Sequence, residues 1–434
     1  MAAYGCEDVA LPVFARDRVI RTRQGHPNRR RSMPFEAITR TVQPDSATGN
    51  AHLQSPTAAL QDRAAIGADP VWKVEQWKVA ATALAVKVLI FIFAAESYLI
   101  LGNEPIHGFK GWLAILYRWD TVHYLDIAEH GYGGPSRDLL AFFPAYPFAV
   151  RFFSTFIPDY LASGLVVSGM ASIVGAVLLY RLAQLDFSSG IARRAAWFLL
   201  IFPTSYFLHF AYAESLFLAL ALGSILGARK GRWADCGITG ALAGFTRING
   251  LVLIPVLAYE AVQQYHKSKR LEWPFLAVLG PGLGFAGYLL VNLRTTGDPL
   301  AFMAVQREHW YKHLAAPWTG LRDTFKSITS RTAMDSQMIG TQELLFVGLG
   351  LVCTIYCWIR LRRAYAIWMT GNWLLFTCTS FIYSVPRYTL TMFPVYMIFA
   401  LLGRNKIWNA IVTLWSLLFL SLFTGLFVRG QWAF

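Results

Sequence analysis

Long apolar segments recur along the chain from Val79 to the C-terminus, and they limit the possible folds more than any other feature. Each is about 20 residues long, the length that an α-helix needs to cross roughly 30 Å of hydrocarbon at about 1.5 Å per residue. The segments are continuously apolar and lack the alternating pattern of an outer-membrane barrel, so the predicted spanning elements are helices. The sequence therefore predicts an all-α, polytopic membrane bundle and excludes a soluble single-core protein.

The composition and the charge agree with this class. Hydrophobic residues make up 55% of the chain and charged residues 15%, against about 45–50% and about 25% in soluble proteins. The formal net charge is 39 − 25 = +14, which in a soluble chain would suggest nucleic-acid binding. Here much of the excess lies in short loops between apolar segments, where cytoplasmic Lys and Arg collect. We therefore expect membrane lipid, and no nucleic acid, as a partner.

The apolar pattern predicts about eleven spans. They lie near residues 79–101, 160–181, 195–210, 213–228, 236–249, 251–265, 274–293, 343–359, 364–383, 389–403 and 407–428.

The loops between these spans predict an orientation. Residues 1–78 are polar and basic and are expected to form a disordered cytoplasmic arm, followed by a membrane domain over 79–434. Every short loop on the same side as the arm is then basic, as the positive-inside rule requires. The two long loops, 102–159 and 294–342, fall outside. The apolar segment 139–157 is expected to be an interfacial helix, because two prolines interrupt it and an extra crossing would place the basic loops outside.

The densest polar cluster is the run RWDTVHYLDIAEHGY, residues 118–132, in the first outer loop. Helical spacing divides its side chains between two faces, with Asp120, His123 and Tyr124 on one and Asp126, Glu129 and His130 on the other. A partly desolvated carboxylate at the lipid boundary is suited to act as a general base toward a lipid-borne hydroxyl. A solvated interfacial helix with ordinary boundary aromatics is the alternative interpretation.

Other polar residues fall on the same predicted side of the membrane, in the short segments 212–215, 246–250 and 384–388. The candidates there are Glu214, Arg247, Asn249, Arg387 and Tyr388. Charges placed against the topological trend usually face a cavity or a partner. Two outer arginines facing an outer Asp and Glu predict a site for an anionic lipid headgroup, since guanidinium binds phosphate through two hydrogen bonds. Snorkelling at a helix end is the alternative for each arginine.

No metal or nucleotide motif stands out. Asp120, Asp126 and Glu129 offer oxygen ligands suited to Mg²⁺ or Mn²⁺, but no spacing requires a divalent cation. The five cysteines give neither a metal-ligand spacing nor an even disulfide set. No Gly-rich nucleotide cradle is evident. The sequence thus predicts no certain cofactor.

Five motifs occur in order between residues 118 and 388. They are RWDTVHYLDIAEHGY followed by AFFPAYP, then PTSYFLHFAYAESLFLALAL, TRINGLVLIP, TGDPLAF and SVPRYTL. Together they resemble the PIG-V family, the GPI mannosyltransferase 2 type of GT-C glycosyltransferases, and its prokaryotic relatives.

The resemblance implies a GT-C bundle whose first outer loop carries the essential acid, with a polyprenyl- or dolichyl-phosphate sugar as donor. Asp120 would be the catalytic base, with Asp126 and Glu129 in reserve, and Arg387 and Arg247 would neutralise the departing phosphate. Inversion would convert a β-linked mannosyl phosphate into an α-mannoside. The expected substrate-binding residues are Arg387, Arg247, Glu214, His123, Tyr124, Asp126, Asn249 and Tyr388.

The acceptor is expected to be lipid-linked or a glycan, at the outer or lumenal face. The membrane would be the bacterial inner membrane, with the site facing outside, or the endoplasmic reticulum in a eukaryote. A transporter or flippase of anionic lipid-linked substrates is the main alternative, although no convincing repeat relates the two halves of the chain. A non-catalytic assembly subunit is another alternative, and it would tolerate the loss of Asp120.

Overall fold

The computed structural model describes residues 74–133, 137–270, 272–330 and 332–434. Within these residues every regular element is a helix, apart from one isolated β-bridge. The all-α prediction is therefore confirmed. Residues 1–73 of the predicted arm lie outside the described residues.

The first helix begins earlier than the predicted first span. Helix α2 (Val74–Gly102) includes a polar first turn that precedes the apolar segment. In that turn Glu75 accepts hydrogen bonds from Lys78 at 2.8 Å and from Arg193 at 2.6 Å. The ion pairs explain why the helix extends beyond the hydrophobic stretch at its N-terminus.

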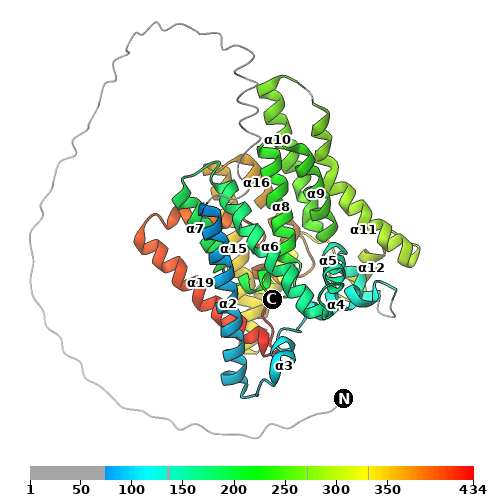
Figure 1. Cartoon of the computed structure of the whole chain (residues 1–434), viewed down its shortest axis with the longest axis vertical. Helices are drawn as coiled ribbons and strands as arrows, with labels where there is room; N and C mark the ends of the chain where they lie inside the picture. Colours follow the sequence, from blue (N-terminus) through cyan, green and yellow to red (C-terminus); the bar gives the residue numbers. More distant parts are fainter. Residues whose placement is uncertain (1–73, 134–136, 271, 331) are drawn as a thin grey trace, which may run out of the picture. The chain divides into compact units, whose positions relative to one another are not determined.

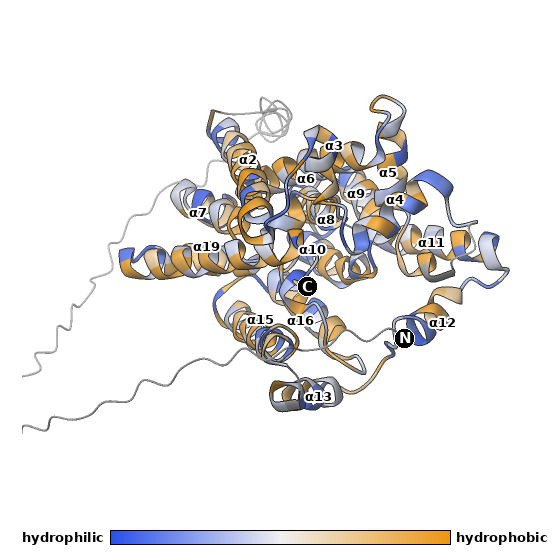
Figure 2. Ribbon diagram, turned by 90° about the horizontal axis from the view of Figure 1, so that it is seen from below, coloured by the Kyte–Doolittle hydropathy of each residue, from blue (hydrophilic) through white to orange (hydrophobic). Residues whose placement is uncertain are grey.

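Five helical segments are long and apolar enough to cross a membrane. They are α2, α6 (Tyr160–Ala183), η4 with α11 (Trp273–Leu279 and Gly280–Thr296), α14 with η5 and α15 (Ala333–Asp335, Ser336–Thr341 and Gln342–Arg360), and α19 (Lys406–Val428). Figure 2 shows that hydrophobic residues dominate α2, α15 and α19. The chain is a multi-pass membrane protein.

The other predicted spans also contain helices, but these have fewer than 18 residues. They are α7 (Ser189–Leu200), α8 (Glu214–Arg229), α9 (Trp233–Thr246), α10 (Leu253–Ser268), α16 (Arg363–Thr377) and α18 (Pro394–Leu402). Short helical or turn segments interrupt the apolar stretches, including η2 (Ser205–Leu208), η3 (Ile248–Val252) and α17 (Val385–Thr389). The number of crossings therefore stays a prediction.

Glycines allow the interior helices to approach closely. Helix α8 packs against α6, α9 and α10, and α9 also packs against α11. A Cβ atom on Gly244 of α9 would lie 2.1 Å from the carbonyl oxygen of Pro281, and one on Gly284 of α11 would lie 1.8 Å from that of Ala241. The backbones of α9 and α11 therefore touch, as small residues permit in membrane helices.

Ion pairs tie several basic turns together at one end of the bundle, near the labels of α7, α10 and α16 (Figure 1). Asp186, after α6, accepts two hydrogen bonds from Arg229 at 2.9 Å and one from the Tyr365 hydroxyl at 2.5 Å. Arg362, before α16, binds Glu260 of α10 through two hydrogen bonds of 2.7 and 2.6 Å. The predicted cytoplasmic loops that these residues mark therefore lie together, as the predicted orientation requires.

The two long loops contain short helices. The first holds α3 (Gly108–Ala114), α4 (Asp120–His130), η1 (Arg137–Ala141) and α5 (Ala145–Ser154), and the second holds α12 (Ala301–Glu308) and α13 (Pro317–Ser330). Helix α5 is too short to span a bilayer, which agrees with the predicted interfacial role of segment 139–157. Its Arg151 donates a 2.6 Å hydrogen bond to the carbonyl of Ala128 and so attaches α5 to α4.

Candidate active site

Four charged side chains from four separate motifs meet at the end of the bundle opposite the basic turns, and they form what is called the charge cluster below. Arg387 donates from Nη1 to Oδ2 of Asp120 at 2.6 Å and from Nε to Oε1 of Glu214 at 2.5 Å. Arg247 donates from Nη1 to the same Glu214 oxygen at 2.5 Å. The side chains of Glu214 and Arg387 are 0% and 8% exposed, whereas that of Asp120 is 24% exposed. Asp120 is therefore the carboxylate of this charge cluster that a substrate can reach.

The backbone before Asp120 is strained. Asp120 is the first residue of α4, and Trp119 before it has a φ of 52°, which is rare for a bulky side chain. The indole of Trp119 packs edge-to-face on Trp432 at 5.4 Å between ring centroids. The Tyr212 hydroxyl donates a 3.1 Å hydrogen bond to the carbonyl of Arg118. These contacts hold the strained turn, which sets the direction of Asp120.

Glu214 enters the cluster because α8 begins at this residue. A carboxylate in the first turn of a helix is favoured by the helix dipole. Oε1 accepts hydrogen bonds from both arginines, whereas Oε2 is buried without a partner among the described residues. A fully buried carboxylate is tolerated when it is paired in this way.

Arg387 lies on the short helix α17 and packs against aromatic rings. Its guanidinium lies 4.8 Å from the ring centroid of Phe207 and 4.7 Å from that of Tyr212. Burial alone would lower the pKa of Arg387, but the Glu214 and Asp120 carboxylates raise it well above its ordinary value. Arg387 therefore remains a cation at every accessible pH.

Lys312 is a further cation that sequence reasoning missed. It lies in the second long loop, which is joined to segment 378–380 by backbone hydrogen bonds. Its ammonium lies 5.3 Å from the ring centroid of Tyr388, and Arg247 lies 5.7 Å from the same ring. The only sequence feature that could have marked Lys312 as a site residue is its place after two aromatic residues, in the run WYK. With Lys312 the site has three cations and two carboxylates, an excess of positive charge that suits a phosphate group.

His123 and Tyr124 form an aromatic wall beside the charge cluster. His123 stacks on Phe142 with 4.9 Å between centroids. Tyr124 packs edge-to-face against Phe142, Tyr146 and Tyr212, and burial raises its pKa, so it stays a neutral phenol.

Asp126 and Asn249 lie outside the charge cluster. Asp126 faces away from Asp120 on α4 and pairs with His130 at 2.9 Å. Asn249 donates from its amide to Oδ1 of Asn372 at 2.8 Å, a buried contact between η3 and α16. Glu129 is exposed on the Asp126 side of α4. Asp120 and Asp126 thus have different partners, as the two predicted faces of α4 imply, and of these two carboxylates only Asp120 contacts Arg387.

The apolar residues of α4 divide between the protein interior and the surface. Leu125 and Ile127 are buried within the protein, because α5 and α6 pack against α4. Val122 and Trp119 keep 37% and 41% of their surface exposed.

Within the described ranges, no three His, Cys, Asp or Glu side chains gather as metal ligands would. The two carboxylates of the charge cluster are held by arginines instead.

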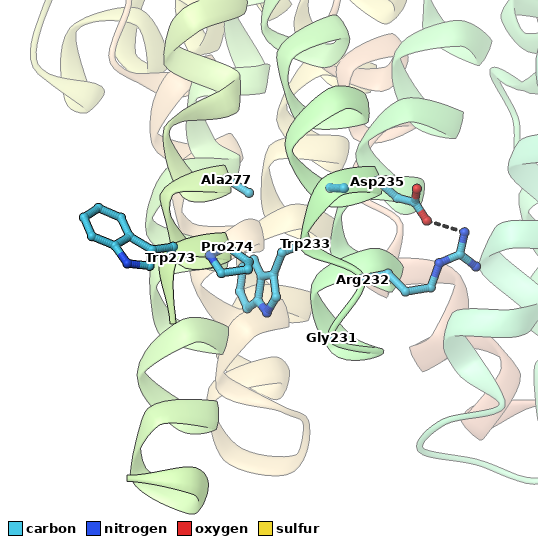
Figure 3. A pocket seen from close by; sticks show the side chains of 8 residues that line it. Gly231, Arg232, Trp233, Asp235, Trp273, Pro274 and Ala277 are labelled. Atoms are coloured by element: carbon cyan, nitrogen blue, oxygen red, sulfur yellow. Dashed lines mark ion pairs between the residues drawn. The ribbon is translucent and has the colours of Figure 1, made fainter. Parts of the chain in front are cut away.

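A pocket lies at the other end of α8 (Figure 3), lined by Gly231, Arg232, Trp233, Ala234, Asp235, Trp273, Pro274 and Ala277. Arg232 is paired there with Asp235, and the Trp273 ring points away from the two. Glu214 is the first residue of α8, and Gly231 lies two residues after its last residue, Arg229. At roughly 1.5 Å per residue, about 22 Å of helix therefore separates the two ends. This pocket is therefore not part of the charge cluster.

Residues 107–272 match the sequence model of the family described as Mannosyltransferase (PIG-V). The predicted resemblance to the PIG-V family is confirmed. The matched segment includes Asp120, Glu214 and Arg247 and ends before Arg387. Three of the four charged residues thus lie in the part of the chain that carries the PIG-V pattern.

Individual relatives agree with the PIG-V match. GPI alpha-1,6-mannosyltransferase 2 of Cricetulus griseus is 32% identical over 186 residues, which are 40% of this chain and 35% of that protein. The Homo sapiens protein of the same name is 30% identical over 230 residues, 46% of each chain. The matched part of this chain therefore spans less than half the length of these relatives. Among solved structures, ArnT from Cupriavidus metallidurans bound to undecaprenyl phosphate has 16% identity and a TM-score of 0.46, covering 77% of this chain and 61% of that chain.

Proposed function

We propose that this protein is a membrane mannosyltransferase that uses a polyprenyl- or dolichyl-phosphate mannose donor. The acceptor would be a hydroxyl group of a lipid-linked or glycan substrate at the outer or lumenal face of a bacterial inner membrane or of the endoplasmic reticulum. The observation that carries the proposal is the charge cluster, in which a partly exposed Asp120 lies within hydrogen-bond distance of a buried arginine. The PIG-V match supports the choice of sugar.

Asp120 acts as the general base in this proposal. Arg387 engages Oδ2, and Oδ1 has no partner among the described residues, so Oδ1 is available to the acceptor hydroxyl. As Oδ1 takes the proton, the hydroxyl oxygen attacks the anomeric carbon, and the bond from that carbon to the phosphate oxygen breaks. The bonding electrons leave with the lipid phosphate. A single displacement of this kind inverts the anomeric centre.

The cations of the site serve the leaving group. Negative charge grows on the lipid phosphate as the bond breaks, and buried, preorganised donors stabilise such charge strongly. Two of the three guanidinium nitrogens of Arg387 bind carboxylates, and Nη2 has no partner among the described residues. Arg247 and Lys312 both face the ring of Tyr388. We assign the phosphate to this group of cations.

The test is transfer of radiolabel by the purified chain in lipid vesicles. Polyprenyl-phosphate [³H]mannose and GDP-[³H]mannose are supplied separately, with a membrane lipid and glycan extract as acceptor. We expect labelled product from the lipid donor only, and loss of that product in Asp120→Asn. Movement of the lipid donor between leaflets without any transfer would support the flippase alternative instead. Transfer that survives Asp120→Asn would refute Asp120 as the general base. Wild-type protein with neither transfer nor donor movement would support the non-catalytic assembly subunit.

A further inference from the structure

Glu343 is a buried carboxylate that the mechanism above does not use. It lies in the first turn of α15 and is 0% exposed. Its two oxygens accept hydrogen bonds from the backbone amides of Ser384 at 2.6 Å and Val385 at 2.7 Å. These amides belong to the turn that leads directly to Arg387. The Glu343 carboxyl group therefore binds the backbone segment that leads to Arg387 of the charge cluster.

That turn has a conformation that needs outside support. Ser384 has a φ of 67°, in the left-handed region that non-glycine residues seldom occupy. The carbonyl of Pro386, two residues later, accepts a 2.9 Å hydrogen bond from the Thr204 hydroxyl. Glu343 and Thr204 thus hold the turn from two sides. Strained segments persist at functional sites only when surrounding contacts fix them in this way.

We propose that Glu343 is a positioning residue, which fixes the Ser384–Arg387 turn and thereby sets the reach of Arg387 to Asp120, Glu214 and the donor phosphate. The effect on the donor rests on the proposed function, whereas the effect on the turn does not. Glu343 touches no reacting atom in this proposal. It acts only through the backbone.

Glu260 provides a matched control. It is also buried, at 1% exposed, and its carboxyl group also accepts two hydrogen bonds, in this case from Arg362 at the basic end of the bundle. Replacing either glutamate with Gln removes a buried carboxylate and costs stability. Only the replacement of Glu343 should disturb the turn before Arg387.

The first measurement is hydrogen–deuterium exchange of the full chain in detergent, read on peptides that cover residues 383–388. A Gln side chain has one acceptor oxygen, so it can satisfy only one of the two amides. We expect Glu343→Gln to speed exchange in these peptides at least tenfold, and Glu260→Gln to leave it unchanged. Unchanged exchange in Glu343→Gln would overturn the proposal. If Glu343→Gln does not accumulate, Glu343→Asp, which retracts the carboxylate by one methylene, is measured with the same criterion.

The second measurement separates positioning from general damage. We expect Glu343→Gln to raise the donor KM roughly tenfold or more while the acceptor KM stays the same, because the arginine that binds phosphate is displaced. General damage would instead lower the active fraction and hence kcat alone. Adding Ser384→Gly should recover part of the donor KM, since glycine adopts the left-handed conformation without the carboxylate. A fall in kcat alone, with no recovery in the double variant, would contradict the proposal.

The two measurements also separate this proposal from the proposed function. Wild-type protein without mannosyl transfer, together with faster exchange in Glu343→Gln, would refute the proposed function and keep Glu343 as the support of the turn. Active wild-type protein, together with unchanged exchange and kinetics in Glu343→Gln, would keep the proposed function and refute the positioning role of Glu343.

Discussion

Arg387→Lys is the substitution that tests the charge cluster most directly. The guanidinium of Arg387 uses two nitrogens to reach two carboxylates, Asp120 at 2.6 Å and Glu214 at 2.5 Å. Lysine keeps the charge but replaces the planar fork with a single ammonium on a flexible stem. It can keep one of these hydrogen bonds at its original geometry and loses the other. The Glu214 side chain is 0% exposed and cannot turn to water, whereas that of Asp120 is 24% exposed and can. We therefore expect the lysine to stay with Glu214 and the link to Asp120 to fail.

The magnitude follows from the burial and the type of bond. The Arg387 side chain is 8% exposed, so solvent does little to compensate for the loss. A hydrogen bond to a charged group contributes about 1.5–3 kcal/mol. At about 1.4 kcal/mol for each factor of ten, kcat/KM for the lipid donor should fall roughly 10- to 150-fold. Arg247 makes one such bond and faces Tyr388, and a lysine can reproduce both contacts. We therefore expect Arg247→Lys to stay within about threefold of the wild type.

The assay is the initial rate of mannosyl transfer against donor concentration, at one ionic strength, for wild type, Arg387→Lys and Arg247→Lys. Thermal stability in the same detergent checks that each variant is folded. Equal kinetics for wild type and Arg387→Lys would show that the donor does not depend on the paired hydrogen bonds of the Arg387 guanidinium. A larger defect in Arg247→Lys than in Arg387→Lys would refute the reasoning from the number of hydrogen bonds.

Three further outcomes follow from the same structure. Asp120→Asn should lower transfer by about 10²- to 10⁴-fold, the usual range for a general base. Asp126→Asn should retain most activity, because Asp126 pairs with the neighbouring His130 and not with the charge cluster. Comparable losses in both variants would mean that Asp120 is not the base. In a cysteine-free background, a cysteine at Thr319 should react with an impermeant thiol reagent added outside the cell, and one at Lys269 should not; the opposite pattern would invert the predicted orientation. Gly244→Ala places a methyl group 2.1 Å from a carbonyl oxygen of helix α11 and should destabilise the bundle by about 1–3 kcal/mol in thermal or denaturant unfolding; an unchanged stability would mean that α9 and α11 separate easily.

The sequence alone was sufficient for the fold class and for the division of α4 into two faces. Continuous apolar segments permit only helices in a bilayer, because hydrocarbon offers no partner for backbone polar groups. The helical period placed Asp120 and Asp126 on different sides of α4, and the structure agrees. Both properties are local, since they depend on neighbouring residues and on the solvent around the chain.

The tertiary structure decided which charges meet. Asp120 and Arg387 are 267 residues apart, and no periodicity relates residues at such a separation. The sequence placed both on one predicted side of the membrane, but packing of α4, α8 and α17 brought them within hydrogen-bond distance. Lys312 and Glu343 were missed for the same reason. Each is a single charge whose partner, an aromatic ring or a strained turn, is distant in sequence and becomes a neighbour only when the helices pack.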